Sequence, residues 1–205
     1  MKLDHVSYVA SHDQITDVVN RIGSQIQTPF TDGGKHPRFG TRNFTAPLVG
    51  GSYIEVVCPM DHPATDATPF GKAVKQKALE GGGWFAWVIS VDDISVLEEK
   101  FGRRSVMGHR VTPSGINYEW KQIGVLGTLK EAQWPFFVEW KKGNHPSTFG
   151  QARAKIKQIE FSSQFNLGII NIESKDMPEL KYGTRNESEI LKIEFLVGKK
   201  VIEIE

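Results

Sequence analysis

The stretch YIEVVCPMDHP at residues 53–63 returns in altered form as FFVEWKKGNHP at residues 136–146. Each copy has a run of aromatic and β-branched residues with a glutamate inside it, and each then reaches His-Pro through a short polar stretch. Such runs are typical of β-strands. Because self-similarity at a fixed offset is the mark of a repeated structural unit, the two phrases predict a duplicated module.

The flanking residues support the duplication, because both halves of the chain read as a strand, a helix and then three strands. The first strands align without gaps, residues 3–11 on residues 83–91, and the last strands align Glu55 on Glu139. We therefore predict an α+β fold in which two βαβββ modules form a cupped, incomplete barrel.

The repeat also predicts how the chain is divided. We expect one domain over residues 1–148, built from modules at 1–66 and 83–148 that a helix at 67–82 connects. Residues 149–205 follow as a β-rich C-terminal extension, which we interpret as a partial third module. Its alternating runs predict short strands, namely AKIKQIEFSS, NLGIINIES, ILKIEFLV and KKVIEIE.

The composition is that of an ordinary soluble globular protein, with 39% apolar and 24% charged residues. The formal net charge of +1 favours neither nucleic acid nor an anionic membrane as a partner, and the apolar runs are too short for a membrane span. The single cysteine, Cys58, excludes an internal disulfide and a cysteine-based zinc site. We expect a cytoplasmic protein.

Alternation along the strands predicts which side chains line the cup. His5 and Ser7 share one face of the first strand, and Tyr53 and Glu55 share one face of a later one. The opposite faces are apolar and suit a covering helix. By the alignment, the equivalent cup-lining positions of the second module are Phe85, Trp87, Ile89, Phe137 and Glu139.

A histidine and two glutamates on one concave surface suggest acid–base chemistry. In a partly dry cup, His5, Glu55 and Glu139 would shift one another's pKa values, and one of them could then act as a general base. The alternative is that His5 only hydrogen-bonds a glutamate inside a lined pocket.

Several stretches together resemble the glyoxalase-like domain proteins of the vicinal oxygen chelate superfamily. They span about residues 1–148 and read LDHVSYVA, GGKHPRFGTRNFTAPL, YIEVV, PFFVEW and NHPST. Members of this superfamily are lyases, isomerases, extradiol dioxygenases, thiol transferases and drug-sequestering binding proteins. The resemblance therefore implies the cup but not the chemistry.

The resemblance also implies a metal site. Metal-using members of the superfamily take ligands from the first and last strands of both modules, which here are His5, Glu55, Phe85 and Glu139. Phenylalanine cannot ligate a metal, but His5 and the two glutamates could hold a divalent zinc, nickel, manganese or iron ion with open positions. Such an ion would polarise the oxygen atoms of a substrate.

The glycine-rich loop DGGKHPRFGTRN at residues 32–43 is a second candidate site. His36 and Arg38 would lie at the mouth of the cup and bind an anionic group, since arginine binds carboxylate or phosphate through two hydrogen bonds. The resemblance to the glyoxalase-like proteins extends here to Asn43 as a pocket residue. The alternative is a solvated basic loop without a binding role.

Aromatic side chains complete the predicted substrate-binding set. Tyr53, Trp87 and Phe137 would stack on a ligand, although Trp87 suits simple core packing equally well. His62 and His145 each precede a proline and are predicted to be turn residues. Cys58 is expected to be buried and inert.

Two functional hypotheses follow. The first is a divalent-metal-dependent enzyme of the lyase, isomerase or dioxygenase type, acting on a small polar metabolite. The second is a non-catalytic protein that binds or sequesters a small-molecule ligand in the same cup; Phe85 at a ligand position favours it, and the two glutamates favour the enzyme. Unpaired strand edges in the extension also suggest a homodimer.

Overall fold

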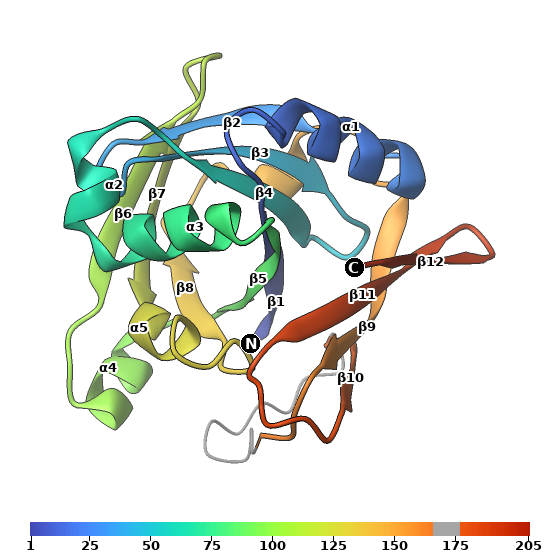
Figure 1. The fold of residues 1–205 in the computed structure, drawn as a ribbon. Helices are drawn as coiled ribbons and strands as arrows, with labels where there is room; N and C mark the ends of the chain where they lie inside the picture. The colour runs from blue at the N-terminus through green and yellow to red at the C-terminus, as the bar shows by residue number, and fades with distance from the viewer. Residues whose placement is uncertain (166–176) are drawn as a thin grey trace.

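The computed structural model describes residues 1–165 and 177–205, which fold into a closed barrel and a second sheet (Figure 1). Eight strands form the barrel in the order β1-β4-β3-β2-β6-β7-β8-β5. Their bounds are β1 Lys2–Val9, β2 Thr31–His36, β3 Thr41–Pro47, β4 Tyr53–Pro59, β5 Gly83–Ser90, β6 Val106–Val111, β7 Asn117–Ile123 and β8 Phe136–Trp140. The fold is thus a mixed α/β fold, as predicted in outline.

The helices connect these strands around the barrel. They are α1 Ile15–Ile26, α2 Pro63–Ala67, α3 Pro69–Leu79, α4 Ser95–Phe101 and α5 Val125–Thr128, with a 3₁₀ helix η1 at Pro146–Thr148. Helix α1 buries Ile15, Val19, Ile22 and Ile26, whose spacing of three and four residues forms one apolar stripe. None of the helices in the described ranges is long and apolar enough to cross a bilayer.

The barrel closes through a narrow seam, where an incomplete barrel was expected. Strands β2 and β6 join the two halves, and their ladder registers only one pair, Lys35 with Val111. The other neighbouring strands share between three and seven registered pairs. The seam therefore completes the barrel with little direct pairing. A closed sheet of this kind leaves no free strand edge for association.

The C-terminal extension forms a four-stranded sheet in the order β10-β9-β11-β12. Its strands are β9 Ala154–Phe161, β10 Glu179–Tyr182, β11 Ile190–Val197 and β12 Lys200–Ile204. Three of them coincide with alternating runs that predicted strands, whereas the short strand β10 was not anticipated. The strand expected in NLGIINIES, residues 166–174, lies outside the described residues.

The largest apolar core lies outside the barrel, between the barrel wall, α1 and the second sheet. Trp87 of β5 is fully buried there and packs on Phe161 of β9, with ring centroids 5.5 Å apart. Burial of such a side chain stabilises a fold by about 1.5–3 kcal/mol. Cys58 is buried in the same core, and burial raises the pKa of its thiol to about 11, in agreement with an inert role.

The second half of the barrel presents the opposite faces to those predicted. Ile89 and Phe137 join the outer core, while Val88 and Val138 belong to a cluster on the inner side of the sheet. The ladder between β1 and β5 is irregular between Ser7 and Tyr8, so that Phe85 is skipped. One extra residue transfers every later side chain to the other face, and the parallel strand β8 follows the register of β5.

Candidate functional site

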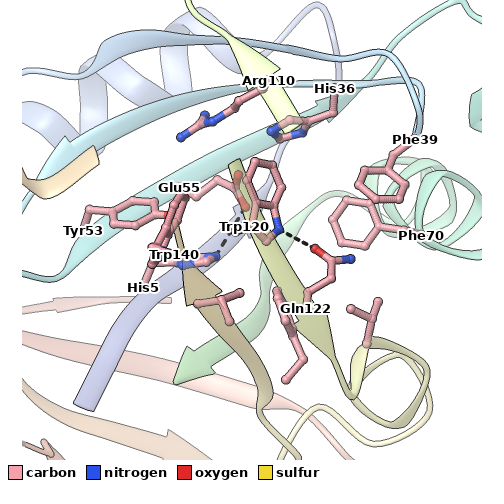
Figure 2. A pocket seen from close by; sticks show the side chains of 13 residues that line it. His5, His36, Phe39, Tyr53, Glu55, Phe70, Arg110, Trp120, Gln122 and Trp140 are labelled. Carbon is pink, nitrogen blue, oxygen red and sulfur yellow. Dashed lines mark hydrogen bonds and ion pairs between the residues drawn. The ribbon is translucent and has the colours of Figure 1, made fainter. Parts of the chain in front are cut away.

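A cavity of about 40 Å³ opens inside the barrel, enough for about three water molecules or one small flat group. Its wall combines three titratable side chains, one arginine and several aromatic rings (Figure 2). The lining residues are His5, His36, Phe39, Tyr53, Glu55, Phe70, Arg110, Trp120, Gln122, Val125, Phe136, Val138 and Trp140.

His5 is held in the cavity wall by its neighbour in sequence. Its Nδ1 atom lies 2.7 Å from Oδ1 of Asp4, and its ring stacks on Tyr53 with centroids 4.5 Å apart. Adjacent side chains on a strand normally point to opposite faces, but the β1–β5 ladder is irregular between Leu3 and His5. The carboxylate of Asp4 therefore orients the imidazole and leaves Nε2 as its acceptor atom.

Asp4 is a buried carboxylate that accepts three hydrogen bonds. Besides His5, its donors are Nε1 of Trp140 at 2.8 Å and Nε2 of His145 at 3.2 Å. Nδ1 of His145 accepts from the backbone N–H of Ser147, which fixes the tautomer that donates to Asp4. Burial alone would raise the pKa of Asp4, but the hydrogen bonds from His145 and His5 hold it far below its ordinary value. Asp4 is thus ionised.

Glu55 is the second buried carboxylate, and both of its oxygen atoms are hydrogen-bonded. Ser7 donates its hydroxyl at 2.8 Å, and Nδ2 of Asn43 donates at 2.5 Å. Burial would raise the pKa of Glu55, but its interactions with His5, His36, Arg110 and Asn43 lower it. Its Oε2 lies 3.9 Å from Nε2 of His5, so a proton taken up at Nε2 would be stabilised by a nearby anion.

Arg110 supplies a fixed positive charge behind this carboxylate. It comes from β6, is only 2% exposed, and donates to the backbone oxygen of Gly33 at 3.1 Å and to Oδ1 of Asn43. Its guanidinium also lies over the ring of Tyr118, 4.7 Å from the centroid. A buried arginine costs several kcal/mol unless it is paired, and the Arg110–Asn43–Glu55 chain provides that pairing.

Gly33 makes room for this chain, which gives a testable prediction. A Cβ atom at Gly33 would overlap Oδ1 of Asn43 and Nη1 of Arg110. We expect Gly33→Ala to lower the free energy of unfolding in urea by about 1–3 kcal/mol, as overpacking does. Gly127→Ala is the matched control, since a Cβ there meets no atom within 4 Å. Equal stability of the two variants would contradict the assignment.

His36 is a neutral histidine in the same wall. Burial and then the charge of Arg110 lower its pKa from 6.5 to about 4, and its Nδ1 lies 3.1 Å from the hydroxyl of Thr41. Between these two pKa values the unfolded chain binds a proton that the folded protein does not. Stability is therefore fully present above about pH 6.5 and falls as the pH is lowered toward about 4.

This linkage predicts a pH effect on unfolding. When the pH is lowered from 7 to 5, the lowered pKa of His36 should reduce the free energy of unfolding of the wild type by about 2 kcal/mol. His36→Gln, which cannot titrate, should lose that part of the pH dependence, whereas the exposed His12→Gln should keep it. Urea unfolding at both pH values is the measurement, and an unchanged slope in His36→Gln would show that His36 titrates normally.

Aromatic rings form the rest of the wall. Trp120 and Trp140 lie with their centroids 5.4 Å apart, and Nε1 of Trp120 donates to Oε1 of Gln122 at 2.7 Å. Figure 2 shows Phe39 and Phe70 side by side near Gln122, and their centroids are 5.5 Å apart. Flat faces of this kind suit a planar or apolar ligand group.

The structure brings together only part of the predicted site. His5, His36, Tyr53 and Glu55 line the cavity, and Asn43 lies buried behind Glu55. Their predicted roles in catalysis and substrate binding remain predictions.

The expected convergence of Glu139, Trp87 and Phe137 on the cup is wrong, because the irregular β1–β5 register turns them outward. Glu139 accepts the backbone N–H of Ile94 at 2.8 Å, before α4. Nε1 of Trp87 donates to the backbone oxygen of Gln133 at 2.9 Å, in the outer core. Phe137 packs on Phe101 of α4, with centroids 6.1 Å apart. Arg38 also lies outside the cavity, where it donates to the backbone oxygen of Met107 at 2.9 Å.

The residues present do not fit the metal that the superfamily resemblance implies. With Glu139 outside the barrel, only His5 and Glu55 remain of the expected ligands, and both oxygen atoms of Glu55 already accept hydrogen bonds. In residues 1–165 and 177–205, no group of three His, Cys, Asp or Glu side chains is placed to hold a metal ion. A catalytic zinc ion is normally held by three such protein ligands.

Several site residues escaped the sequence analysis. Asp4 was not singled out from the sequence, because strict alternation places it on the face opposite His5. His145 was predicted only to be a turn residue, which it also is, since it caps η1. Arg110, Trp120 and Trp140 were also missed. The sequence offered a signal for one of them, because alternation within its strand places Trp120 on the same face as Tyr118 and Gln122. Their convergence on His5 depends on barrel closure, which no local pattern reveals.

The sequence matches the family model of the glyoxalase-like domain over residues 3–166. No curated protein sequence matches the chain. Similar solved structures include a methylmalonyl-CoA epimerase from Mycobacterium tuberculosis, 11% identical, which covers 70% of this chain and 89% of its own at a TM-score of 0.46. A hypothetical protein from Bacillus halodurans is 16% identical, and the match covers 70% of this chain and 96% of that protein, with a TM-score of 0.42. A variant methylmalonyl-CoA epimerase from Streptomyces coelicolor, bound to 2-nitronate-propionyl-CoA, is 12% identical. The match covers 72% of this chain and 98% of that protein, with a TM-score of 0.47.

Proposed function

Because the chain belongs to the glyoxalase-like domain family, we propose that it is an enzyme of the isomerase or lyase type that moves a proton on a small, oxygen-bearing metabolite. The observation that carries this proposal is the Asp4–His5 pair, with Nδ1 of His5 bound to a buried carboxylate and Nε2 in the cavity wall. An imidazole oriented by a buried carboxylate is the arrangement of a general base in many enzymes.

The surroundings of His5 suit a proton acceptor. When Nε2 takes a proton, the resulting imidazolium lies between Asp4, at 2.7 Å from Nδ1, and Glu55, at 3.9 Å from Nε2. Both carboxylates are buried and their pKa values are lowered, so both are negative at neutral pH. The proton is thus accepted between two carboxylates, and general acid–base catalysis contributes about 10² to 10⁴-fold.

The opposite wall suits the negative charge that develops on the substrate. Arg110 is fixed by Gly33 and Asn43, and a preorganised positive charge stabilises an enolate-like oxygen without reorganisation. The neutral His36 adds a polar group beside it. The rings of Tyr53 and Trp120 would hold the flat part of the substrate between these groups.

The proposal is tested by exchange of carbon-bound hydrogen with solvent. The purified protein is incubated in D₂O with a panel of small carbonyl compounds that carry an acidic C–H bond, and deuterium uptake is followed by mass spectrometry. We expect uptake into at least one compound, and we expect it to persist in the presence of EDTA, because the described part of the chain places no three ligand side chains around a metal. If no compound of the panel takes up deuterium, the proton-transfer assignment is refuted.

A sequestering protein is the second candidate, favoured by one observation. Both oxygen atoms of Glu55 already accept hydrogen bonds from the protein, so a ligand would be held mainly by the aromatic rings and by the other polar side chains of the wall. Such a protein would bind members of the panel, as calorimetry would show, without catalysing exchange. Binding without exchange thus separates this function from the first.

Three finer features belong to the same proposal. The order β1-α1-β2-β3-β4 followed by β5-α4-β6-β7-α5-β8, in which α5 is a helix of only four residues, supports two repeated βαβββ modules within residues 1–148. Residues 149–205 would be a separate extension, although its sheet shares the outer core with the barrel. A homodimer in the cytoplasm remains the expected state.

A further inference from the structure

A second cavity adjoins the inner pocket on the outside of the barrel. It has a volume of about 310 Å³, and it shares with the inner pocket the four residues Phe39, Phe70, Gln122 and Val125. These four side chains therefore form the boundary between the two spaces. A ligand that passes Phe39 and Phe70 would reach both.

The wall of this outer groove is basic. Arg38, Arg103 and Arg104 line it, and its lining contains no aspartate or glutamate. The remaining lining is polar at Thr68 and Gln122 and otherwise mostly apolar, including the exposed side chains of Val106 and Leu126. Three guanidinium groups on one surface favour an anionic ligand group, which arginine binds through paired hydrogen bonds.

The three arginines are brought together by the fold. Arg38 comes from the turn after β2, and Nη1 of Arg38 donates to the backbone oxygen of Met107 in β6 at 2.9 Å. Arg103 and Arg104 follow α4 and lead into β6, and the guanidinium of Arg103 lies 5.7 Å from the ring centroid of Phe101. Arg104 is also paired with Glu98 at 3.3 Å, but its side chain is 93% exposed, so it can turn toward a ligand.

We propose that the inner pocket and the outer groove form one binding cleft for a small organic phosphate. The planar, oxygen-bearing part of the ligand would lie among the aromatic rings near His5, and its phosphate would bind Arg38, Arg103 and Arg104. Gln122 lies between the two, and since its carbonyl oxygen accepts from Trp120, its amide nitrogen is the end that can donate to the ligand. The assignment rests on the proposed function and narrows its substrate class.

The test uses phenyl phosphate as a probe with both parts, and phenol as the probe that lacks the phosphate. Calorimetry on the full chain should show tighter binding of phenyl phosphate than of phenol, and this advantage should shrink as salt is added. The double variant Arg103→Gln/Arg104→Gln should weaken phenyl phosphate about tenfold or more and leave phenol unchanged. Arg153→Gln, an exposed arginine outside both cavities, is the matched control.

The outcomes separate this proposal from the proposed function. Phenyl phosphate that binds no more tightly than phenol, or that the double variant does not weaken, overturns the groove as a phosphate site. Arg38→Gln, a single exposed change, gives a second reading if the double variant is poorly folded. Proton exchange in D₂O is measured on carbonyl compounds without phosphate, so it can succeed or fail independently of the groove.

Discussion

His5→Ala is expected to abolish proton exchange, lowering the rate of deuterium uptake by about 10² to 10⁴-fold. The substitution removes the acceptor nitrogen that the cavity presents and leaves the aromatic wall in place. A substrate would then still bind near Tyr53 but would have no group positioned to take its proton. Mass spectrometry of the panel compound in D₂O measures the effect directly.

Two further variants make this result specific. His12→Ala removes an exposed histidine before α1 and should leave exchange unchanged. Glu139→Gln should also leave it unchanged, because that carboxylate caps the backbone before α4 from outside the barrel. Full activity in His5→Ala, or loss of exchange in Glu139→Gln equal to that in His5→Ala, would place the proton acceptor elsewhere.

Asp4→Asn should have the largest effect on stability. The asparagine keeps the shape of the side chain, but its amide group would face donors on His5, Trp140 and His145. Removing one partner from a buried charged network costs about 3–5 kcal/mol, measured as the free energy of unfolding at pH 7. Asp92→Asn, at an exposed position, is the control and should change stability little.

Asp4 acts through His5, so a positioning role needs its own measurement. In the wild type, Nδ1–H of His5 points to Asp4, and NMR of the ring nitrogens should show that tautomer. In Asp4→Asn we expect a mixture of tautomers and a shifted pH profile of exchange. A variant that is less stable but keeps the His5 tautomer and the pH profile would reduce Asp4 to a structural residue.

The same carboxylate should make the protein acid-sensitive. The folded pKa of Asp4 lies below its ordinary value of 3.8, so its contribution to stability is present above that pH and is lost as the pH falls below it. His36 acts in a higher window, between its pKa of about 4 and the ordinary 6.5. The two groups can therefore be separated by the pH range in which the difference in stability between each variant and the wild type changes.

The first half of the barrel could be read from the sequence because its strands alternate regularly where the site lies. His5, Tyr53 and Glu55 were placed on one face by period-2 alternation, and the structure brings all three to one cavity. The direct ladder between β1 and β4 pairs His5 with Tyr53 and Ser7 with Glu55, without a break. Local pattern and tertiary register agree there.

The second half could not be read in the same way. An ungapped alignment put Glu139 with Glu55, but the irregular pairing at Phe85 moves the later side chains to the other face. A single inserted residue leaves the local alternation of β5 and β8 intact, so the sequence of each strand looks the same in either register. The metal hypothesis depended on that register, and it fails with it.

By itself, the sequence determined most of the elements and their order, since strand and helix patterns depend on neighbours a few residues apart. It also determined that His5 and Glu55 share a face. Only the tertiary structure decided that Asp4 orients His5, that Arg110 lies behind Glu55 through Asn43, and that Val138 rather than Glu139 faces the cavity. These contacts are set by strand register and barrel closure, which bring together residues far apart in the chain. The strands pair through backbone hydrogen bonds, which depend little on side-chain identity and therefore leave no local signal in the sequence.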